Sequence, residues 1–252
     1  ALMARGIGVQ KDALEAVLGR PGSVAFSVNE KLPVALPTAE AQASLFPPAG
    51  EAVLSSSAKT SAVAPRGLPV SPSLTFETFV EGSSNRLAFT AAQAVSERPS
   101  QAYNPLIIYG GTGLGKTHLL QAIANQITKG HPGLTYTFIS AEKFMNEFTR
   151  SLQLKTMNDF RKLFRSVDVL LIDDVQFLDD PKVGTQNEFF YTFHDLYHNN
   201  KQIVATSDVH PTQSQLNTRL KSRFEMGLVV EIMPPDLETR IAILHQKAAS
   251  RG

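Results

Sequence analysis

The sequence predicts an α/β fold in which helices cover both faces of a doubly wound parallel sheet. From residue 74 onward, short apolar runs alternate with longer stretches whose apolar residues recur at helical spacing. The runs at 105–109 and 168–173 are almost continuously apolar, as expected of strands buried on both faces. Ligands bind such sheets at the carboxyl ends of the strands, so functional residues are expected there.

The individual elements follow from the same periodicities. We expect strands at 105–109, 134–139, 168–173, 202–206 and 228–232. We expect helices at 84–97, 116–129, 141–152, 156–165, 185–199, 212–220 and 235–250. Together they predict a three-layer domain with a five-stranded parallel sheet over residues 74–252.

Two different segments precede this domain. Residues 33–73 hold seven of the 15 prolines and a single aromatic residue, Phe46. Such a segment buries too little apolar surface to offset its ordering entropy, which predicts a flexible linker, with an ordered extension as the alternative. Within residues 1–32, a helical pattern is followed by strand-like alternation, which indicates the remnant of a small α+β domain.

Composition narrows the class of protein. The 24 Lys and Arg residues nearly balance the 23 Asp and Glu residues, so any contact with nucleic acid must come from local clusters. The absence of cysteine excludes disulfides and thiolate metal sites and is typical of a cytoplasmic protein. No apolar run is long enough to predict a membrane span, and no signal peptide is recognisable.

The most informative motif is Gly-Gly-Thr-Gly-Leu-Gly-Lys-Thr at 110–117, directly after the apolar run at 106–109. Its glycines let successive backbone N–H groups point at phosphate oxygens, and the helix that follows adds its positive N-terminal end. Lys116 supplies a positive charge for the outer phosphates, and the Thr117 hydroxyl is placed to ligate Mg²⁺. A plain glycine-rich turn would lack the Lys-Thr pair, so the motif predicts a P-loop that binds a nucleoside triphosphate.

The strand at 168–173 ends in two carboxylates, Asp173 and Asp174. In P-loop ATPases this position meets the metal and the attacking water, so we expect Asp173 to hold Mg²⁺ and Asp174 to polarise the water. The alternative is a pair of acids that cap the next helix. Glutamate often occupies the second position, and the shorter aspartate predicts slow hydrolysis, at a turnover no higher than about 1 per second.

Two further segments are candidates for sensing the nucleotide. In a sheet ordered 5-1-4-3-2, the strand at 203–208 lies between the strands of the two preceding motifs, and Asp208 or Thr206 would then face the γ-phosphate. The alternative is a simple turn before Pro211. Arg219 and Arg223 follow a predicted short helix, where an arginine reaches the nucleotide of a neighbouring copy more easily than its own. A solvated basic face is the alternative for both.

An ordered set of short strings resembles one family closely. The strings are Thr75-Phe76-Glu77-Thr78-Phe79, Tyr103-Asn104-Pro105-Leu106, Gly-Lys-Thr-His at 115–118, Asp173-Asp174-Val175-Gln176-Phe177, Thr206-Ser207-Asp208, Ser222-Arg223-Phe224 and Gly227-Leu228. They are similar to those of the DnaA family of bacterial chromosomal replication initiators, in the AAA+ class. The resemblance covers residues 74–252, and residues 8–30 look like the end of the family's N-terminal domain.

The resemblance implies roles for individual residues. Asp208 would be the first sensor, Arg223 a trans-acting arginine finger and Arg219 a second interface arginine. The adenine and ribose pocket would draw on the segment from Val80 to Asn85. The nucleotide-binding set implied here comprises Val80, Asn85, Gly111, Gly113, Leu114, Gly115, Lys116, Thr117 and His118.

The resemblance also implies partners. ATP-bound copies would form oligomers on origin DNA and melt the duplex, with single-stranded contacts at Thr149, Arg150 and Lys182. The family commonly has a small apolar residue at the position of Thr149, and a second basic residue beside Lys182 is replaced by Val183 and Gly184. The replicative helicase is implied as a partner of the N-terminal domain, and acidic phospholipids as a further one. A helical lid and a helix-turn-helix domain that reads duplex DNA are expected after residue 252.

Two other classes of protein share parts of this pattern. A replication-linked regulatory or loading ATPase has the same core but usually lacks a long linker behind a domain remnant. A metabolic P-loop enzyme would need an acceptor site for a small molecule, which nothing in the sequence supplies. The proline-rich segment therefore favours the initiator, with ATP acting as an assembly switch.

Overall fold

The computed structural model describes residues 67–179 and 183–249, which all belong to one compact unit. The predicted domain remnant at 1–32 and the linker up to residue 66 lie outside the described residues. Residues 67–73, predicted as the end of the linker, make contacts with the domain: the Leu68 N–H donates to the Phe138 carbonyl at 2.6 Å. The described contacts of the domain therefore begin at residue 67, before the predicted boundary at 74.

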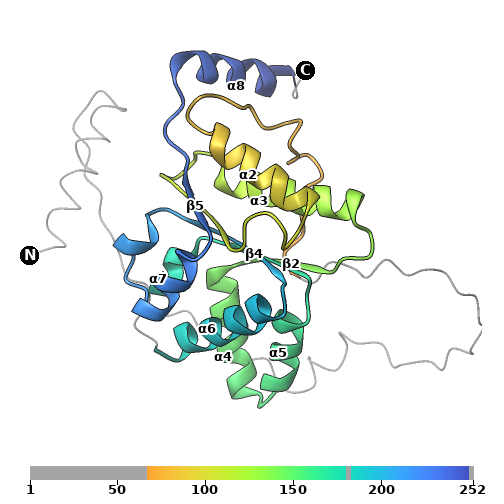
Figure 1. Ribbon diagram of the computed structural model, residues 1–252, viewed down its shortest axis with the longest axis vertical. Coiled ribbons are helices and arrows are strands. Elements are labelled where there is room, and N and C mark those ends of the chain that lie inside the picture. The colour runs from red at the N-terminus through yellow and green to blue at the C-terminus, as the bar shows by residue number, and fades with distance from the viewer. Residues whose placement is uncertain (1–66, 180–182, 250–252) are drawn as a thin grey trace, which may run out of the picture. The chain divides into compact units, whose positions relative to one another are not determined.

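A parallel five-stranded sheet forms the centre of the domain (Figure 1). Its strands are β1 (Leu106–Tyr109), β2 (Tyr136–Ser140), β3 (Val169–Asp173), β4 (Gln202–Ser207) and β5 (Leu228–Glu231). They lie in the order β2-β3-β4-β1-β5, which confirms the predicted order. In the register, Ala205 of β4 pairs with Ile107 of β1 on one side and with Ile172 of β3 on the other. The carboxyl ends of β1, β3 and β4 therefore meet at one edge.

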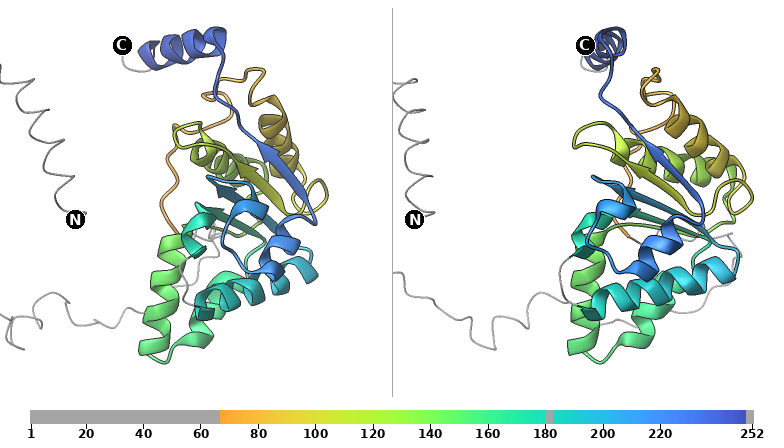
Figure 2. Two further views of the ribbon diagram at one scale, coloured as in Figure 1. Left: turned by 90° about the vertical axis from the view of Figure 1, so that its left-hand side faces the viewer. Right: turned by 60° about the vertical axis from the view of Figure 1, so that its left-hand side comes forward.

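Helices cover both faces of the sheet (Figures 1 and 2). One face carries α2 (Arg86–Glu97) and α3 (Lys116–Gly130); the other carries α4 (Ala141–Gln153), α5 (Met157–Arg165), α6 (Val183–His198) and α7 (Thr218–Phe224). Successive residues of β1 alternate between the two cores: Leu106 and Ile108 pack with α2 and α3, and Ile107 packs with the other layer. All three side chains are fully buried, and the two cores confirm the three-layer prediction.

A cluster of phenylalanine rings joins the helices of the second layer. The fully buried Phe144 ring of α4 lies 4.9–5.4 Å, centroid to centroid, from Phe160, Phe164 and Phe189. Glu188 of α6 is also buried and accepts hydrogen bonds from Arg161 and Arg165 of α5. The apolar cluster joins α4, α5 and α6, and these ion pairs add a link between α5 and α6.

The predicted helix at 212–220 is wrong. The chain instead forms a short 3₁₀ turn, η3 (Pro211–Gln213), and then α7, which begins at Thr218. Ser214 is extended, with ψ of 164°, and the Asn217 side chain accepts from the Leu220 N–H at 3.0 Å to cap the new helix. Arg219 and Arg223 therefore lie on α7 itself and do not follow a helix.

The last helix, α8 (Leu237–Ala249), follows an extended segment after β5 and packs near the segment that precedes α2 (Figure 2). Asp236 joins them, since it accepts from the Ser83 hydroxyl at 2.9 Å and from the Thr239 N–H at 2.8 Å. Thr239 is buried, and a Cβ atom at Gly82 would lie 2.2 Å from its hydroxyl oxygen. In residues 67–179 and 183–249, no helix combines the length and apolar character needed to cross a membrane.

Candidate functional site

The predicted phosphate loop connects β1 to α3, and close packing dictates two of its glycines. Gly110 has φ of 153°, and a Cβ atom there would lie 2.3 Å from the Ile232 carbonyl oxygen. Gly115 has φ of 98°, and its Cβ atom would lie 2.9 Å from the Phe79 ring. Both positions exclude a side chain, so the loop can run close to β5 and to the segment before α2. Helix α3 begins at Lys116, as predicted.

Lys116 is almost fully buried at the carboxyl edge of the sheet. Its ammonium group donates to the carbonyls of Gly110 and Gly111 at 2.8 and 2.9 Å, and to Asp208 Oδ1 at 2.8 Å. Two predicted residues, 92 positions apart in the chain, are thus joined by an ion pair. A buried ammonium group at a helix N-terminus is an electrostatic site suited to an anion such as a phosphate.

Asp173 forms the second part of the site at the end of β3. Its carboxylate accepts hydrogen bonds from the hydroxyl groups of Thr117, at 2.8 Å, and of Thr206. Burial raises the pKa of Asp173 above its usual value, although these two hydrogen bonds act in the opposite direction. The hydroxyl and carboxylate predicted to hold Mg²⁺ therefore lie within hydrogen-bond distance of each other.

The two sensor candidates at the carboxyl end of β4, Thr206 and Asp208, have different hydrogen-bond partners. Thr206 is buried between the two acids: its hydroxyl donates to Asp173 and accepts from the Asp174 N–H at 2.9 Å. Asp208 instead faces the phosphate loop through its bond to Lys116. The structure thus places Asp208 beside the predicted phosphate site and gives Thr206 a role in fixing the acid pair.

Gln176, which sequence reasoning missed, completes this edge. It lies in the 3₁₀ turn η2 (Val175–Asp179). Its side-chain amide donates to Asp174 Oδ1 and accepts from the Asp208 N–H, both at 3.1 Å. Its signal in the sequence is its place in the string Asp173-Asp174-Val175-Gln176-Phe177, which carries part of the family resemblance but assigned Gln176 no role.

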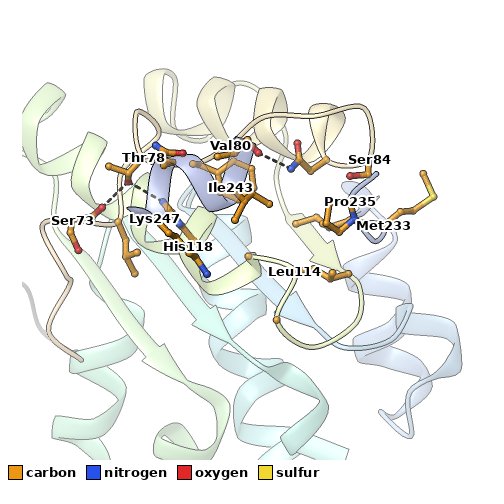
Figure 3. A pocket seen from close by; sticks show the side chains of 17 residues that line it. Ser73, Thr78, Val80, Ser84, Leu114, His118, Met233, Pro235, Ile243 and Lys247 are labelled. Carbon is orange, nitrogen blue, oxygen red and sulfur yellow. Dashed lines mark hydrogen bonds between the residues drawn. The ribbon is translucent and has the colours of Figure 1, made fainter. Parts of the chain in front are cut away.

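A cavity of about 430 Å³ adjoins the phosphate loop (Figure 3). Its lining includes Val80 and Asn85, from the segment predicted to bind adenine and ribose, together with Gly113, Leu114, Gly115 and His118. Asn85 also shapes the wall, because its side chain donates to the Val80 carbonyl at 3.0 Å and accepts from the Gly82 N–H at 2.9 Å. The predicted base-binding segment and the phosphate loop therefore border one cavity.

Several residues that line this cavity had no predicted role in binding the nucleotide. Phe79 packs against Phe89 and against the edge of the His118 ring. Ile243, Gln246 and Lys247 of α8 close the opposite side, and Met233 and Pro235 contribute the segment after β5. Figure 3 shows Ile243 and Leu114 approaching the hollow from different elements. This side of the cavity depends on how α8 packs against the rest of the domain, and no local sequence pattern predicts that packing.

A polar face of α3 holds the segment that leads into the cavity, residues 71–79, which we call the strap. The Asn125 side-chain amide donates to the carbonyls of Ser71 and Leu74 at 2.9 and 2.8 Å, and Gln121 accepts from the Ser71 N–H at 2.8 Å. His118 Nε2 lies 2.9 Å from the Thr75 carbonyl oxygen. Because residues 118, 121 and 125 share one face of the helix, the phosphate-loop helix itself positions the strap.

The two candidate interface arginines lie on α7, outside this network. Arg219 is exposed near the start of α7, and the guanidinium of the half-buried Arg223 lies 5.9 Å from the Phe190 ring centroid and 3.3 Å from the Met226 sulfur. Shortly after α7, a Cβ atom at Gly227 would collide with Pro105, just before β1. Arg223 therefore lies toward the amino edge of the sheet, opposite the phosphate loop of its own chain.

The predicted DNA contacts are not brought together with this site. Thr149 and Arg150 are both exposed in the last part of α4. Lys182 lies outside the described residues.

The family described as the bacterial DnaA ATPase domain matches residues 70–231. The chromosomal replication initiator protein DnaA of Pelobacter propionicus is 54% identical over 180 residues, which is 71% of this chain and 40% of that protein. The chain thus spans about two fifths of the length of this curated relative.

Solved structures agree with the family match. Domain III of the Thermotoga maritima replication initiation protein DnaA matches with a TM-score of 0.71 and 47% identity, over 73% of this chain and 77% of that chain. A structure of the replication initiator DnaA bound to AMPPCP and single-stranded DNA matches with a TM-score of 0.68 and 43% identity, over 72% of this chain and 56% of that chain. Since the family match spans more than half of the sequence and includes both the phosphate loop and the acid pair, this chain belongs to the bacterial DnaA ATPase-domain family.

Proposed function

We propose that this chain is the ATP-binding core of an initiator of chromosomal DNA replication. ATP-bound copies assemble on origin DNA and promote duplex melting, and slow hydrolysis reverses the assembly. The observation that carries the proposal is the hydrogen-bonded network at the carboxyl edge, in which Lys116 joins Asp208 and Thr117 joins Asp173. A network of this kind beside a phosphate loop suits a site that distinguishes a triphosphate from a diphosphate.

The residues at this edge fit Mg²⁺. Thr117 Oγ1 and Asp173 Oδ2 are hard oxygen ligands 2.8 Å apart, and Mg²⁺ in phosphate sites usually takes only one or two protein ligands. In the described part of the chain, no group of three His, Cys, Asp or Glu side chains could hold a metal alone, so phosphate oxygens would complete the ligand set. When bound, the ion neutralises phosphate charge.

The chain's own residues divide the remaining work. Lys116 binds the outer phosphates, and Gly111, Gly113 and Gly115 present backbone to them. Asp174 orients and polarises the attacking water, while Asp208 reports the γ-phosphate because Lys116 is shared between them. An aspartate at position 174 supports slow turnover, so hydrolysis acts as a timer.

Assembly depends on an arginine supplied by a neighbour. Arg223 lies toward the amino edge of the sheet, away from its own phosphate loop, so the γ-phosphate it serves belongs to the next copy. The charge-assisted contact exists only with ATP, which makes the triphosphate an assembly switch. Arg219, exposed on the same helix, is a second interface arginine.

The partners proposed are origin DNA, further copies of the chain, the replicative helicase and acidic phospholipids, in a cytoplasmic protein. Single-stranded DNA contacts fall at Thr149, Arg150 and Lys182; the exposure of the first two supports this, as does the relative solved with single-stranded DNA. The helicase and duplex DNA would be bound by domains outside residues 67–249. Family membership favours this reading over a loading ATPase or a metabolic P-loop enzyme.

Nucleotide binding tests the proposal directly. We expect Lys116→Ala to abolish binding of a fluorescent ATP analogue to the 252-residue chain, because it removes the buried ammonium group. Lys129→Ala, an exposed lysine at the other end of α3, is the matched control and should bind normally. Undiminished binding by Lys116→Ala would place the nucleotide elsewhere and overturn the proposal.

A further inference from the structure

Gln176 occupies the point where the acid pair meets the sensor strand. Its amide nitrogen donates to Asp174 Oδ1 and its amide oxygen accepts from the Asp208 N–H, each at 3.1 Å. The side chain is half-buried on η2. One amide thus bridges two residues that lie 34 positions apart and directly follow two different strands, β3 and β4.

The two partners leave the amide only one orientation. A backbone N–H can only donate, so it requires the amide oxygen, and an ionised carboxylate can only accept, so it requires the amide NH₂. A flipped amide would lose both hydrogen bonds. The bridge therefore specifies both the side-chain length and the order of its two polar atoms.

Asp174 is held in an uncommon backbone conformation. Its φ is 59°, in the left-handed region that residues other than glycine rarely adopt. The Thr206 hydroxyl accepts from its N–H at 2.9 Å, and Gln176 holds its carboxylate. Residues in such conformations persist when surrounding contacts over-determine them, and they concentrate at functional sites.

The bridge also extends to the phosphate loop. Asp208, whose N–H binds Gln176, accepts from Lys116 through its side chain at 2.8 Å. A continuous path of hydrogen bonds therefore runs from the phosphate-binding lysine through Asp208 and Gln176 to Asp174. Displacement of Asp208 by a changed phosphate would be transmitted to the Asp174 carboxylate.

We propose that Gln176 is a positioning residue. It orients the Asp174 carboxylate toward the attacking water and couples this orientation to Asp208. This inference rests on the proposed ATP hydrolysis and deepens it. In this role Gln176 acts through Asp174, whose carboxylate accepts its hydrogen bond. Its loss lowers turnover and leaves nucleotide affinity unchanged, because Lys116 and the cavity stay intact.

Two variants of nearly equal size separate positioning from packing. Gln176→Glu keeps an acceptor for the Asp208 N–H but turns a carboxylate toward Asp174, so the donated hydrogen bond becomes a repulsion. Gln176→Met keeps the volume and loses both hydrogen bonds. A residue that only fills space would tolerate both changes.

The matched control is Gln213→Glu. Gln213 is exposed on η3, which follows β4 at the same edge of the sheet, so the substitution adds the same charge nearby without touching Asp174. All variants are compared for single-turnover ATP hydrolysis and for affinity toward a fluorescent ATP analogue. Normal affinity also shows that a variant is folded.

We expect turnover by Gln176→Glu and Gln176→Met to fall about 10- to 100-fold, since misplacing a reacting group by roughly 1 Å can cost about 100-fold. The affinity of Gln176→Met, and both properties of the Gln213→Glu control, should match the wild type. Gln176→Glu adds a negative charge beside the proposed phosphate site, so it should bind ATP more weakly and is compared by its single-turnover rate at saturating ATP. Wild-type turnover in either Gln176 variant would overturn the inference, and so would a loss of affinity in Gln176→Met equal to its loss of turnover. A wild-type chain that binds ATP without hydrolysing it would also overturn the inference, while nucleotide binding, tested by Lys116→Ala, would stand.

Discussion

Removal of the Asn125 side chain tests whether α3 positions the strap that leads into the cavity. Asn125→Ala deletes the two hydrogen bonds to the carbonyls of Ser71 and Leu74, at 2.9 and 2.8 Å. At about 0.5–1.5 kcal/mol net for each bond, the docked strap loses about 1–3 kcal/mol. Gln121 and His118 still hold it, so part of the population remains docked.

The weaker docking of the strap should lower the affinity for ATP and leave the affinity for inorganic triphosphate unchanged. Apparent affinity falls in proportion to the docked fraction, and about 1.4 kcal/mol corresponds to a tenfold change. We therefore expect ATP to bind about tenfold more weakly. Inorganic triphosphate should bind as before, because Lys116 and the phosphate loop make no contact with Asn125.

Isothermal titration calorimetry with ATP and with inorganic triphosphate, both in excess magnesium, measures the two affinities. Gln126→Ala, the next position on α3 and only half-buried, is the matched control and should leave both unchanged. Equal weakening of ATP and triphosphate would mean that the substitution disturbs the helix itself. Unchanged ATP affinity would refute the link between the strap and the cavity.

Two further predictions concern the proposed interface between copies of the chain and Asp168, which directly precedes β3. Arg223→Ala should retain ATP affinity and lose ATP-dependent oligomers in light scattering, whereas Arg98→Ala, an exposed arginine on the α2 side, should assemble normally; unchanged oligomers in Arg223→Ala would reject the trans role. Burial raises the pKa of Asp168, but hydrogen bonds from Lys201 and Thr135 more than offset this, so its pKa lies below the usual 3.8. The stability it contributes is therefore present above about pH 4 and is lost as the pH falls through its lowered pKa. In urea unfolding, Asp168→Asn should be less stable than wild type at pH 7, and the gap should narrow toward pH 3; a constant gap would contradict the linkage.

The motifs located two of the strands directly. A phosphate loop requires β1 before it, and the acid pair marks the end of β3; the expected order 5-1-4-3-2 then puts the strand before Asp208 between them. The start of α3 at Lys116 followed for the same reason. In these segments a local pattern and a chemical requirement coincide.

The sequence-based predictions failed or were incomplete where tertiary contacts determine the local structure. The apolar spacing at 212–220 suited one helix, but Pro211 starts a separate turn and Asn217 caps a new helix. Gln176 was given no role because its partners are a backbone N–H and a carboxylate that follow two different strands. The polar face of α3 was missed because it binds the backbone of the strap, which leaves no complementary pattern of side chains.

The negative charge at the carboxyl edge allows a test of the proposed Mg²⁺ site, because one substitution should change ATP affinity in opposite directions with and without the metal. Asp173, Asp174 and Asp208 face one ammonium group, that of Lys116, so carboxylates outnumber it before a polyanionic nucleotide arrives. Carboxylates and phosphates that lie close together repel one another. A divalent cation is therefore needed to offset the excess negative charge. Asp173→Asn removes one negative charge and one proposed magnesium ligand. We therefore expect it to weaken ATP binding in magnesium but to strengthen it relative to wild type in EDTA, as measured by competition with a fluorescent analogue. If the variant were weaker to the same degree in both buffers, Asp173 would act through the fold and not through charge and metal.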